Sequence, residues 1–166
     1  MNPTSRLKFT KLQLTDTPDY HCLTGNAAVM EYITGNPYSL TESQDEVKRL
    51  VNTFGQHPAA GLWVARSIQD ATFIGVGALI PLGDGIVDLG YRIHPEYWNQ
   101  GYGYEIGQAL LQFSQQHRSM HKLIASVAPN NIGSKKILER LGLKPKGKSI
   151  DNNGLPELNY ELILTN

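Results

Sequence analysis

The amino-acid sequence predicts an α+β fold, with a single mixed, mostly antiparallel central sheet flanked by helices. Helix-like and strand-like patterns are interleaved without the regular βαβ repeat that a fully parallel sheet needs. Three strand patterns follow one another across short turns, which is typical of an antiparallel meander. The 166 residues are enough for one hydrophobic core, and no linker divides them, so we expect a single domain over residues 1–166.

The N-terminal third is expected to hold one strand followed by helices. Alternating apolar residues predict a strand over residues 7–14, and one or two short helices are expected over residues 19–32. The segment Thr41-Glu42-Ser43-Gln44 has the form of a capping box and precedes apolar residues at helical spacing. We therefore expect a helix that begins at this box and ends near Gly55.

The remainder of the chain predicts six strands and two helices. Turn residues at Gln69-Asp70 and Gly83-Asp84-Gly85 join the first three strands, and Gly142 ends the second helix. In chain order, the expected elements are strands over residues 62–68, 72–82 and 86–93, a helix after a glycine-rich turn, a strand over 123–127, the helix before Gly142, and strands over 144–150 and 158–164.

Composition and charge narrow the class of protein. The formal net charge is zero, so no global field steers the chain to nucleic acid or to an acidic membrane, and we expect neither partner. No apolar run approaches the roughly 20 residues of a membrane span. The N-terminus lacks an apolar signal segment, and the single cysteine, Cys22, is interpreted as a buried thiol. These features predict a cytoplasmic protein.

A glycine-rich turn between a strand and a helix is the most informative functional signal. Residues Gln100-Gly101-Tyr102-Gly103-Tyr104 follow the strand over residues 86–93 and open the next helix. The first amides of a helix lack intrachain acceptors and carry the positive end of the helix dipole, so they can bind a pyrophosphate. Gly101 can take a positive φ, and both glycines let a ligand approach closely. The alternative is a tight connection that binds nothing.

A Rossmann dinucleotide site is the natural competitor for such a turn. Its glycine fingerprint follows the first strand of the unit and is paired with an acidic residue about 20 residues later. The turn at Gly101 follows a meander instead. We therefore expect no Rossmann site. We also expect no P-loop, because its Gly-Lys-Ser/Thr sequence is taken to be absent.

A second segment, Asn130-Asn131-Ile132-Gly133-Ser134, opens the helix that Gly142 ends, and Asn130 or Asn131 caps it. Together the two segments resemble the GNAT superfamily of acyl-CoA-dependent N-acetyltransferases. The loop of that superfamily reads Gln/Arg-x-x-Gly-x-Gly/Ala, and its later helix begins Asn-x-x-Ser. The segment Tyr97-Trp98-Asn99-Gln100-Gly101-Tyr102 is more similar to the branch that contains the ribosomal-protein N-terminal acetyltransferases.

Three residues depart from the family pattern. Trp98 stands where the superfamily has Gln or Arg, Asn99 where this branch has Gly, and Leu143 where Phe is usual. None of them removes a backbone donor from the turn, although Asn99 can alter its shape.

The resemblance implies that an acetyl group passes from acetyl-CoA to a primary amine by direct attack, without a metal. Ser134 matches the family serine near the sulfur, where it protonates the thiolate; the alternative is that it bonds the free amides of its helix. Asn131 has the same capping alternative. The implied acetyl-CoA ligands are Ile93, Asn99, Gln100, Gly101, Tyr102, Gly103, Tyr104 and Asn131.

The base and the acceptor are less well defined by the sequence. The candidate bases are Asp88, Glu157 and water, and Asp88 has the alternative of facing solvent. Glu105 is interpreted as structural, because an acidic group in the first turn of a helix is favoured by the dipole alone. The resemblance implies an acceptor groove formed by residues 29–38 and 151–157.

These two segments carry no dense acidic patch. We therefore expect the acceptor to be a protein or peptide N-terminus, for example that of a ribosomal protein, or a small amino compound, in preference to a polyamine. An alternative from another class is a catalytically silent module that binds acyl-CoA as a sensor. The protein is expected to be a monomer or a homodimer.

Overall fold

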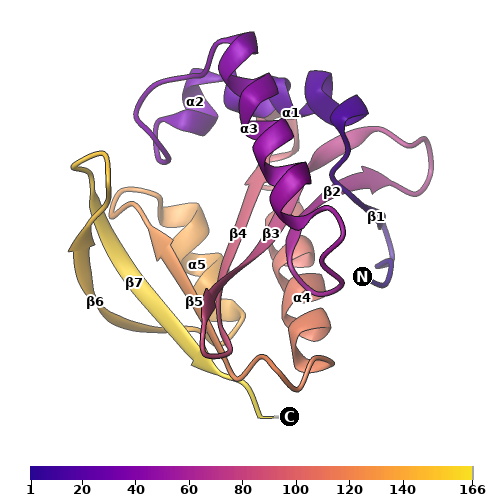
Figure 1. Cartoon of the computed structure of the whole chain (residues 1–166). Coiled ribbons are helices and arrows are strands. Elements are labelled where there is room, and N and C mark those ends of the chain that lie inside the picture. The colour runs from indigo at the N-terminus through magenta and orange to yellow at the C-terminus, as the bar shows by residue number, and fades with distance from the viewer. Residues whose placement is uncertain (166) are drawn as a thin grey trace.

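Seven strands form one sheet at the centre of the computed structural model, which describes residues 1–165 (Figure 1). The strand order is β1-β2-β3-β4-β5-β7-β6, and each neighbouring pair is antiparallel except β4 and β5. This confirms the mixed, mostly antiparallel sheet that the sequence predicts. The strands are β1 Leu7–Lys11, β2 Gly61–Ser67, β3 Phe73–Gly83, β4 Ile86–Ile93, β5 Lys122–Val127, β6 Lys144–Ile150 and β7 Pro156–Ile163.

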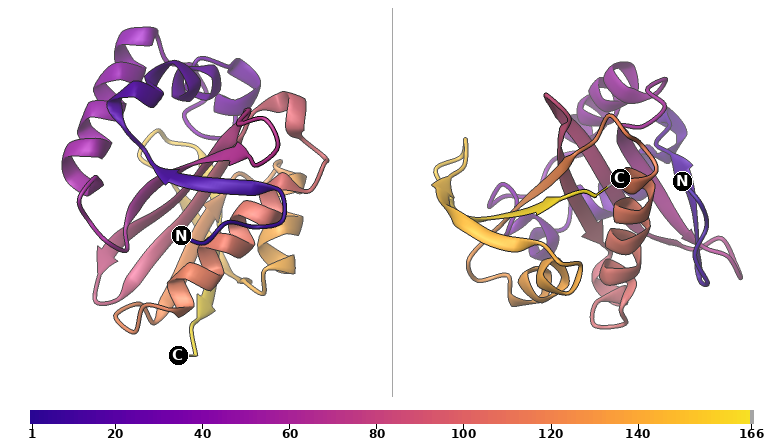
Figure 2. Two further views of the ribbon diagram at one scale, coloured as in Figure 1. Left: turned by 90° about the vertical axis from the view of Figure 1, so that its right-hand side faces the viewer. Right: turned by 90° about the horizontal axis from the view of Figure 1, so that it is seen from below.

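Helices cover both faces of the sheet (Figure 2). Successive side chains of a strand point to opposite faces, and β2 is buried on both. Its Leu62 and Val64 belong to the core beneath α1, α2 and α3, whereas Trp63 and Ala65 belong to the core beneath α4 and α5. The helices are α1 Thr17–Thr24, α2 Ala27–Met30, α3 Leu40–Phe54, α4 Tyr102–Gln115 and α5 Ile132–Arg140, with 3-10 turns at η1 Leu14–Asp16 and η2 Pro95–Tyr97.

The two parallel strands at the centre of the sheet separate along their length. β4 and β5 pair only from Ile86 opposite Lys122 to Asp88 opposite Ile124. Beyond this point β4 remains paired with β3, and β5 with β7, so the two strands diverge as Figure 1 shows. The backbone edge of β4 after Asp88 therefore has no strand beside it on the β5 side.

Glycines bring α4 close to its neighbours. A Cβ at Gly77 on β3 would lie 2.8 Å from Ile106 Cγ2, and a Cβ at Gly107 would lie 2.6 Å from Leu141 Cδ1. Both contacts are shorter than real Cβ contacts, so α4 can lie this close to the sheet and to α5 only because these positions lack side chains. The N-terminus of α4 is thereby held at the end of β4.

The beginning of α3 differs from the prediction. The capping box is formed by Ser39 and Glu42, because Ser39 Oγ accepts from Glu42 N at 3.2 Å and Ser39 N donates to Glu42 Oε2 at 2.7 Å. The predicted box at Thr41 is wrong because the helix has already begun at Leu40. The predicted end of this helix at Gly55 is confirmed.

Two other predictions for the N-terminal third need correction. The first strand ends at Lys11, because residues Leu14–Asp16 form a 3-10 turn. Cys22 is exposed on α1 and is not a buried thiol, since Tyr20 and Leu23 are the residues by which this helix packs into the core. Among residues 1–165, no helix is long and apolar enough to cross a bilayer.

Candidate active site

The loop before α4 contains two residues in the left-handed region. Gly101, the N-cap of α4, has φ +83°, and Asn99 has φ +59°. Asparagine is among the few residues that adopt this conformation at low cost. Asn99 therefore meets the backbone requirement of a position at which the related branch has glycine, and the departure from the family pattern leaves the turn intact.

The first amides of α4 are free to bind a ligand. Glu105 N donates to Gly101 O at 3.1 Å, which begins the helical hydrogen bonding. The amides of Tyr102, Gly103 and Tyr104 donate to no acceptor within the described part of the chain, residues 1–165. They lie at the positive end of a 14-residue helix, which is the arrangement that the sequence predicts for a pyrophosphate.

The two glycines of the motif serve different purposes. Gly101 is exposed, and a Cβ there would meet only Arg6 Nη2, at an ordinary contact distance of 3.6 Å. Lack of space therefore does not require glycine at this position, whereas the positive φ favours it. Gly103 is buried, and its Cβ would lie 2.8 Å from Ile137 Cδ1 on α5. Gly103 therefore allows α4 and α5 to pack closely. The sequence had predicted that this glycine lets the ligand approach.

Trp98 ties the loop to the end of β4. Its indole Nε1 donates to Ile93 O at 2.8 Å, and Gln100 Nε2 donates to Glu96 O at 2.7 Å. Trp98 thus anchors the loop from the position at which the superfamily has Gln or Arg. The Ile93 carbonyl, on a residue predicted to bind acetyl-CoA, is engaged by this contact.

Ser134 faces β4 across the gap between the diverging strands. Ser134 Oγ lies 2.9 Å from Tyr91 Oη, while Ser134 N donates to Asn131 Oδ1 at 3.0 Å. Asn131 is therefore the cap of α5, and the Ser134 hydroxyl is not used for capping. Burial raises the pKa of Tyr91 to about 12, so its hydroxyl stays protonated near neutral pH. The pairing of Tyr91 with Ser134 was not predicted from the sequence.

A cavity of about 430 Å³ lies beside β4. Asp88 lines it at the point where β4 and β5 part, together with Tyr91 and Ser134. Burial, and to a smaller extent the charge of Glu157, raise the pKa of Asp88 to about 6. Asp88 is thus partly buried at the border of this cavity, so the alternative that it simply faces solvent does not hold.

The predicted acceptor segments supply only part of this cavity. Tyr32 and Ile33 come from the first segment and Glu157 from the second. Helix α3 was predicted as a helix but not as part of the site, and it contributes Glu46 and Arg49 to the lining. An amphipathic helix far from both motifs gave no signal by which its polar residues could have been assigned to the site.

Three carboxyl groups from separate elements border the cavity. They are Glu46 on α3, Asp88 on β4 and Glu157 on β7. Glu46 Oε2 is buried without a hydrogen bond in the described residues, and it lies 4.0 Å from Nη1 of Arg92. The two predicted segments supply only Glu157 of these three carboxyl groups, and the fold adds Glu46 and Asp88 from distant parts of the chain. Arg49 and Arg92 line the same cavity, so its charge is mixed.

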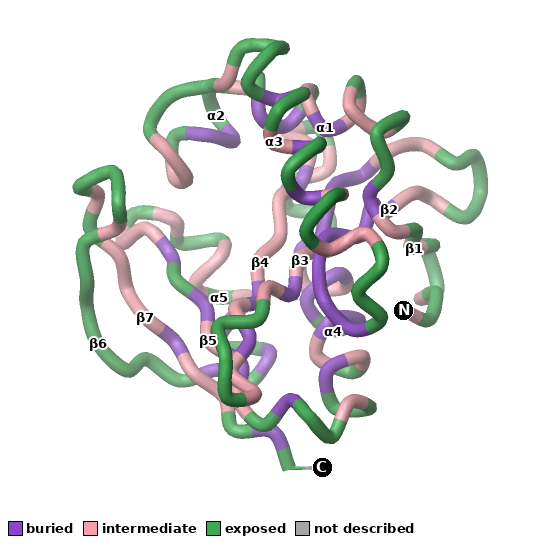
Figure 3. Tube along the Cα trace, viewed as in Figure 1, coloured by how far each residue is buried: buried purple, intermediate pink, exposed green. Residues whose placement is uncertain are grey.

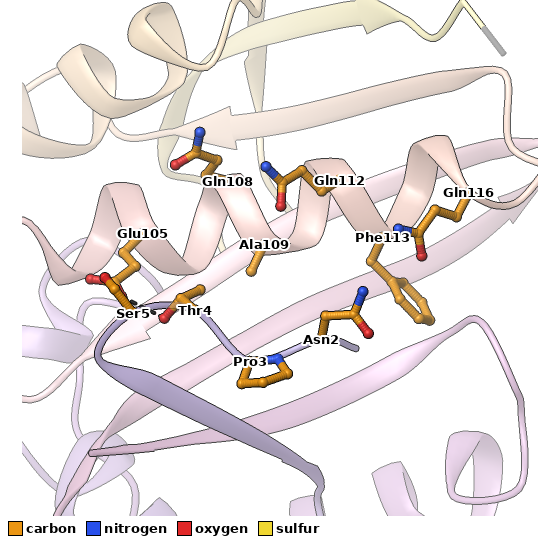
Figure 4. A pocket seen from close by; sticks show the side chains of 10 residues that line it. All are labelled: Asn2, Pro3, Thr4, Ser5, Glu105, Gln108, Ala109, Gln112, Phe113 and Gln116. Carbon is orange, nitrogen blue, oxygen red and sulfur yellow. Dashed lines mark hydrogen bonds between the residues drawn. The ribbon is translucent and has the colours of Figure 1, made fainter. Parts of the chain in front are cut away.

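A smaller hollow of about 260 Å³ lies between the N-terminal segment and α4 (Figure 4). Its lining is mostly amide and hydroxyl side chains, and Glu105 is its only titratable side chain. The larger cavity is the candidate reaction site, because it alone joins Asp88 to the pair formed by Tyr91 and Ser134.

The sequence also contains Gly142-Leu143-Lys144-Pro145-Lys146-Gly147-Lys148-Ser149, which has the letters of a P-loop. A P-loop needs a strand before it and a helix after it. Here the segment follows α5 and forms β6, an exposed edge strand (Figure 3). The expectation that Gly-Lys-Ser/Thr is absent is therefore wrong, because Gly147-Lys148-Ser149 is present, but its structural context is not that of a P-loop. No group of three metal-ligating side chains lies within residues 1–165.

A free helix N-terminus after the end of β4 is the arrangement that the resemblance to acyl-CoA-dependent transferases implies for the cofactor's pyrophosphate. The model of the acetyltransferase (GNAT) domain family matches residues 6–144. The chain therefore belongs to the GNAT family and is an N-acetyltransferase of that family.

Known proteins of similar sequence and structure fall in the same family. An uncharacterized N-acetyltransferase of Bacillus subtilis, YnaD, is 24% identical over 144 residues, which cover 87% of this chain and 82% of the relative. The spermidine N-acetyltransferase of Vibrio cholerae, solved with CoA and spermine, superposes with a TM-score of 0.81 at 22% identity, covering 96% of each chain. A ribosomal L7/L12 N-terminal acetyltransferase solved with CoA gives a TM-score of 0.84 at 15% identity, covering 98% of this chain and 97% of that one. These two structures share the fold and differ from each other in acceptor.

Coenzyme A should raise the melting temperature of the protein, because a ligand that binds only the native state stabilises it by mass action. Gly101→Val should abolish this shift, since valine at φ +83° is strained and its side chain crowds the free amides. Gly142→Val is a matched control, because Gly142 also has a positive φ, +92°, but lies at the end of α5. It should lower the melting temperature and leave the CoA shift intact. Equal CoA shifts in both variants would contradict the assignment of the loop.

Proposed function

We propose that this GNAT protein transfers an acetyl group from acetyl-CoA to a primary amine that enters the cavity beside β4. The observation that carries the proposal is that one cavity borders both Asp88 and the pair formed by Tyr91 and Ser134. A carboxylate that can accept a proton and a hydroxyl that can donate a hydrogen bond thus line the same cavity. Acetyl-CoA supplies a thioester that is already activated, so the main task of the chain is to align the reactants.

For the cofactor, the proposal assigns the pyrophosphate to the amides of Tyr102, Gly103 and Tyr104. These donors are free, and the helix dipole favours an anion there. The Asn131 oxygen is used in capping, so only its amide nitrogen is available to the cofactor's amide arm. The roles of Ile93, Asn99, Gln100, Gly101 and Asn131 toward acetyl-CoA remain predictions.

Asp88 is the proposed base. The amine nitrogen forms its bond to the carbonyl carbon, the carbon–sulfur bond breaks, and the proton of the nitrogen passes to the Asp88 carboxylate. A pKa of about 6 leaves Asp88 ionised at neutral pH and makes it a better proton acceptor than an ordinary aspartate. Glu157, which raises this pKa through its charge, supports Asp88 in this account.

Ser134 is the proposed donor to the departing sulfur. Tyr91, held 2.9 Å from Ser134 Oγ, can donate to this oxygen and orient it. The pKa of Tyr91, about 12, is well above the value of about 8.5 for a thiol, so Tyr91 does not give up its own proton outright. The proton that the sulfur finally takes comes from solvent through Ser134, while the hydroxyl stabilises the developing charge.

The proposed acceptor is an N-terminal α-amino group of a protein or peptide. Its pKa of about 8 leaves a substantial neutral fraction at physiological pH, whereas a lysine side chain with a pKa near 10.4 is almost fully charged. A base as weak as Asp88 is adequate for such an amine. A small polycationic amine is a second candidate, because Glu46, Asp88 and Glu157 border the cavity and outnumber its two arginines, Arg49 and Arg92.

Ser134→Ala should lower kcat by roughly 100-fold while CoA affinity changes little, because the hydroxyl acts on the transition state. The free energy of unfolding should fall by no more than about 1 kcal/mol, since Asn131 caps α5 and the Tyr91 hydroxyl keeps the Ser134 carbonyl as an acceptor. Asn131→Ala is the stability control and should lose about 1 kcal/mol. Steady-state kinetics and urea denaturation measure both effects. Unchanged turnover in Ser134→Ala would remove Ser134 from the mechanism.

The pH dependence tests Asp88. The profile of kcat/KM should fall below pH 6, where Asp88 is protonated, and Asp88→Asn should lower kcat by about 100-fold or more.

The stability of the protein should also depend on Asp88. Because the pKa of Asp88 in the folded protein, about 6, is raised above the unfolded value of 3.8, the free energy of unfolding falls as the pH rises between these two values. Asp88→Asn should therefore raise the melting temperature at pH 7. Asp45→Asn, at an exposed position on α3, should change neither property. A wild-type profile that Asp88→Asn leaves unaltered would exclude Asp88 as the base.

The acceptor is tested with peptides that carry both a free N-terminus and an internal lysine, and with spermidine. Fragment mass analysis should find the acetyl group on the α-amine, at a rate that rises with pH as this amine is deprotonated. Label on lysine alone would contradict the proposed acceptor. Acetylation of spermidine alone, with Glu46→Gln raising its KM, would establish the second candidate in its place.

A further inference from the structure

The N-terminal segment is tied to the loop before α4 by Arg6. Its Nε donates to Glu105 Oε2 at 2.7 Å, its Nη2 lies 2.6 Å from the same oxygen, and its Nη1 donates to Gln100 O at 3.1 Å. The guanidinium carbon lies 4.0 Å from the centroid of the Tyr102 ring. One side chain therefore holds the loop, the first residue of α4 and the first turn of that helix.

Glu105 completes the attachment. Its Oε1 accepts from Thr4 Oγ1 at 2.5 Å and from Arg6 N at 3.2 Å, and its side chain is only 13% exposed. Figure 4 shows Thr4 and Glu105 facing one another across the start of α4. The contacts join residues that are 94 to 101 apart in the sequence.

The loop that Arg6 holds has little else to fix its shape. Asn99 and Gly101 both adopt left-handed conformations. The side chains of Trp98 and Gln100 bond only to nearby residues of the chain, Ile93 and Glu96. The Arg6 bond to the Gln100 carbonyl fixes the peptide between these two left-handed residues. The direction of the free amides that follow depends on this peptide.

Charge gives a second reason for the contact. A carboxylate in the first turn of α4 is favoured by the helix dipole but would repel an anion bound at the same helix start. Arg6 pairs with this carboxylate and neutralises it. Its fork of donors and its planar stacking on Tyr102 are properties that lysine lacks.

We propose that Arg6 is a positioning residue for CoA: it fixes the loop in the shape that presents the amides of Tyr102, Gly103 and Tyr104, and it neutralises Glu105 beside them. The inference rests on the proposed cofactor site at the start of α4. Arg6 acts through the loop and is not assigned a contact with the reacting atoms.

The experiment measures the Kd of CoA by calorimetry for Arg6→Ala, Arg6→Lys and a control, Arg66→Ala. Arg66 pairs with Asp16 and Asp19 at 3.0 and 2.5 Å and joins β2 to the start of α1, so it also links distant segments by charge. Arg6→Ala should weaken CoA binding on the order of tenfold or more. Arg6→Lys, which keeps the charge and is the variant safer for folding, should fall between Arg6→Ala and the wild type. Arg66→Ala should lower the melting temperature and leave the Kd unchanged.

A donor without phosphates separates positioning from general damage. S-acetyl-pantetheine lacks the pyrophosphate, so its kcat/KM should be the same for Arg6→Ala and the wild type, whereas the KM for acetyl-CoA should rise without a fall in kcat. An unchanged CoA Kd in Arg6→Ala, wild-type affinity in Arg6→Lys, or an equal loss in Arg66→Ala would overturn the inference. If the wild type itself fails to bind CoA, the proposed cofactor site fails first, and the two failures are thereby distinguished.

Discussion

The separation of β4 and β5 after Asp88 and Ile124 is the constraint on which the rest of the structure depends. Three parallel residue pairs join the two halves of the sheet, and the divergence then opens the sheet at its centre. The end of β4 leads to the loop and to the start of α4, and the residues from Asp88 to Arg92 border the cavity. A site for an anion and a site for an amine can therefore meet at one strand.

Other contacts have to hold the elements on the two sides of the gap in place, because β4 and β5 do not pair beyond Asp88 and Ile124. Gly77 and Gly107 set α4 close to the sheet and to α5, which fixes the position of its N-terminus. The contact of Tyr91 with Ser134 bridges the gap from β4 to α5. The pKa of Asp88 is raised mainly because burial disfavours its charged form, so the role proposed for Asp88 as a base comes at the expense of stability.

The sequence predicted those features that depend on neighbours along the chain. The positive φ of Gly101, the free helix start, the cap at Asn131 and the meander are all set by a few consecutive residues. The features that it missed depend on contacts between distant segments. Neither the Arg6 contact with Glu105 nor the meeting of Glu46, Asp88 and Glu157 has a periodicity or spacing that sequence alone can reveal. The capping box was missed by two residues because Ser39 and Thr41 both fit the pattern locally, and only the start of the helix decides between them.

The central claim is that the free amides at the start of α4 bind the pyrophosphate of CoA, and amide hydrogen exchange measured residue by residue by NMR tests it most directly. In the free protein the amides of Tyr102, Gly103 and Tyr104 lack acceptors and should exchange rapidly. Saturating CoA should slow their exchange, whereas pantetheine, which has no phosphates, should leave it unchanged. Slowing elsewhere in the protein with no change at these three amides would show that CoA binds by another route and would contradict the account.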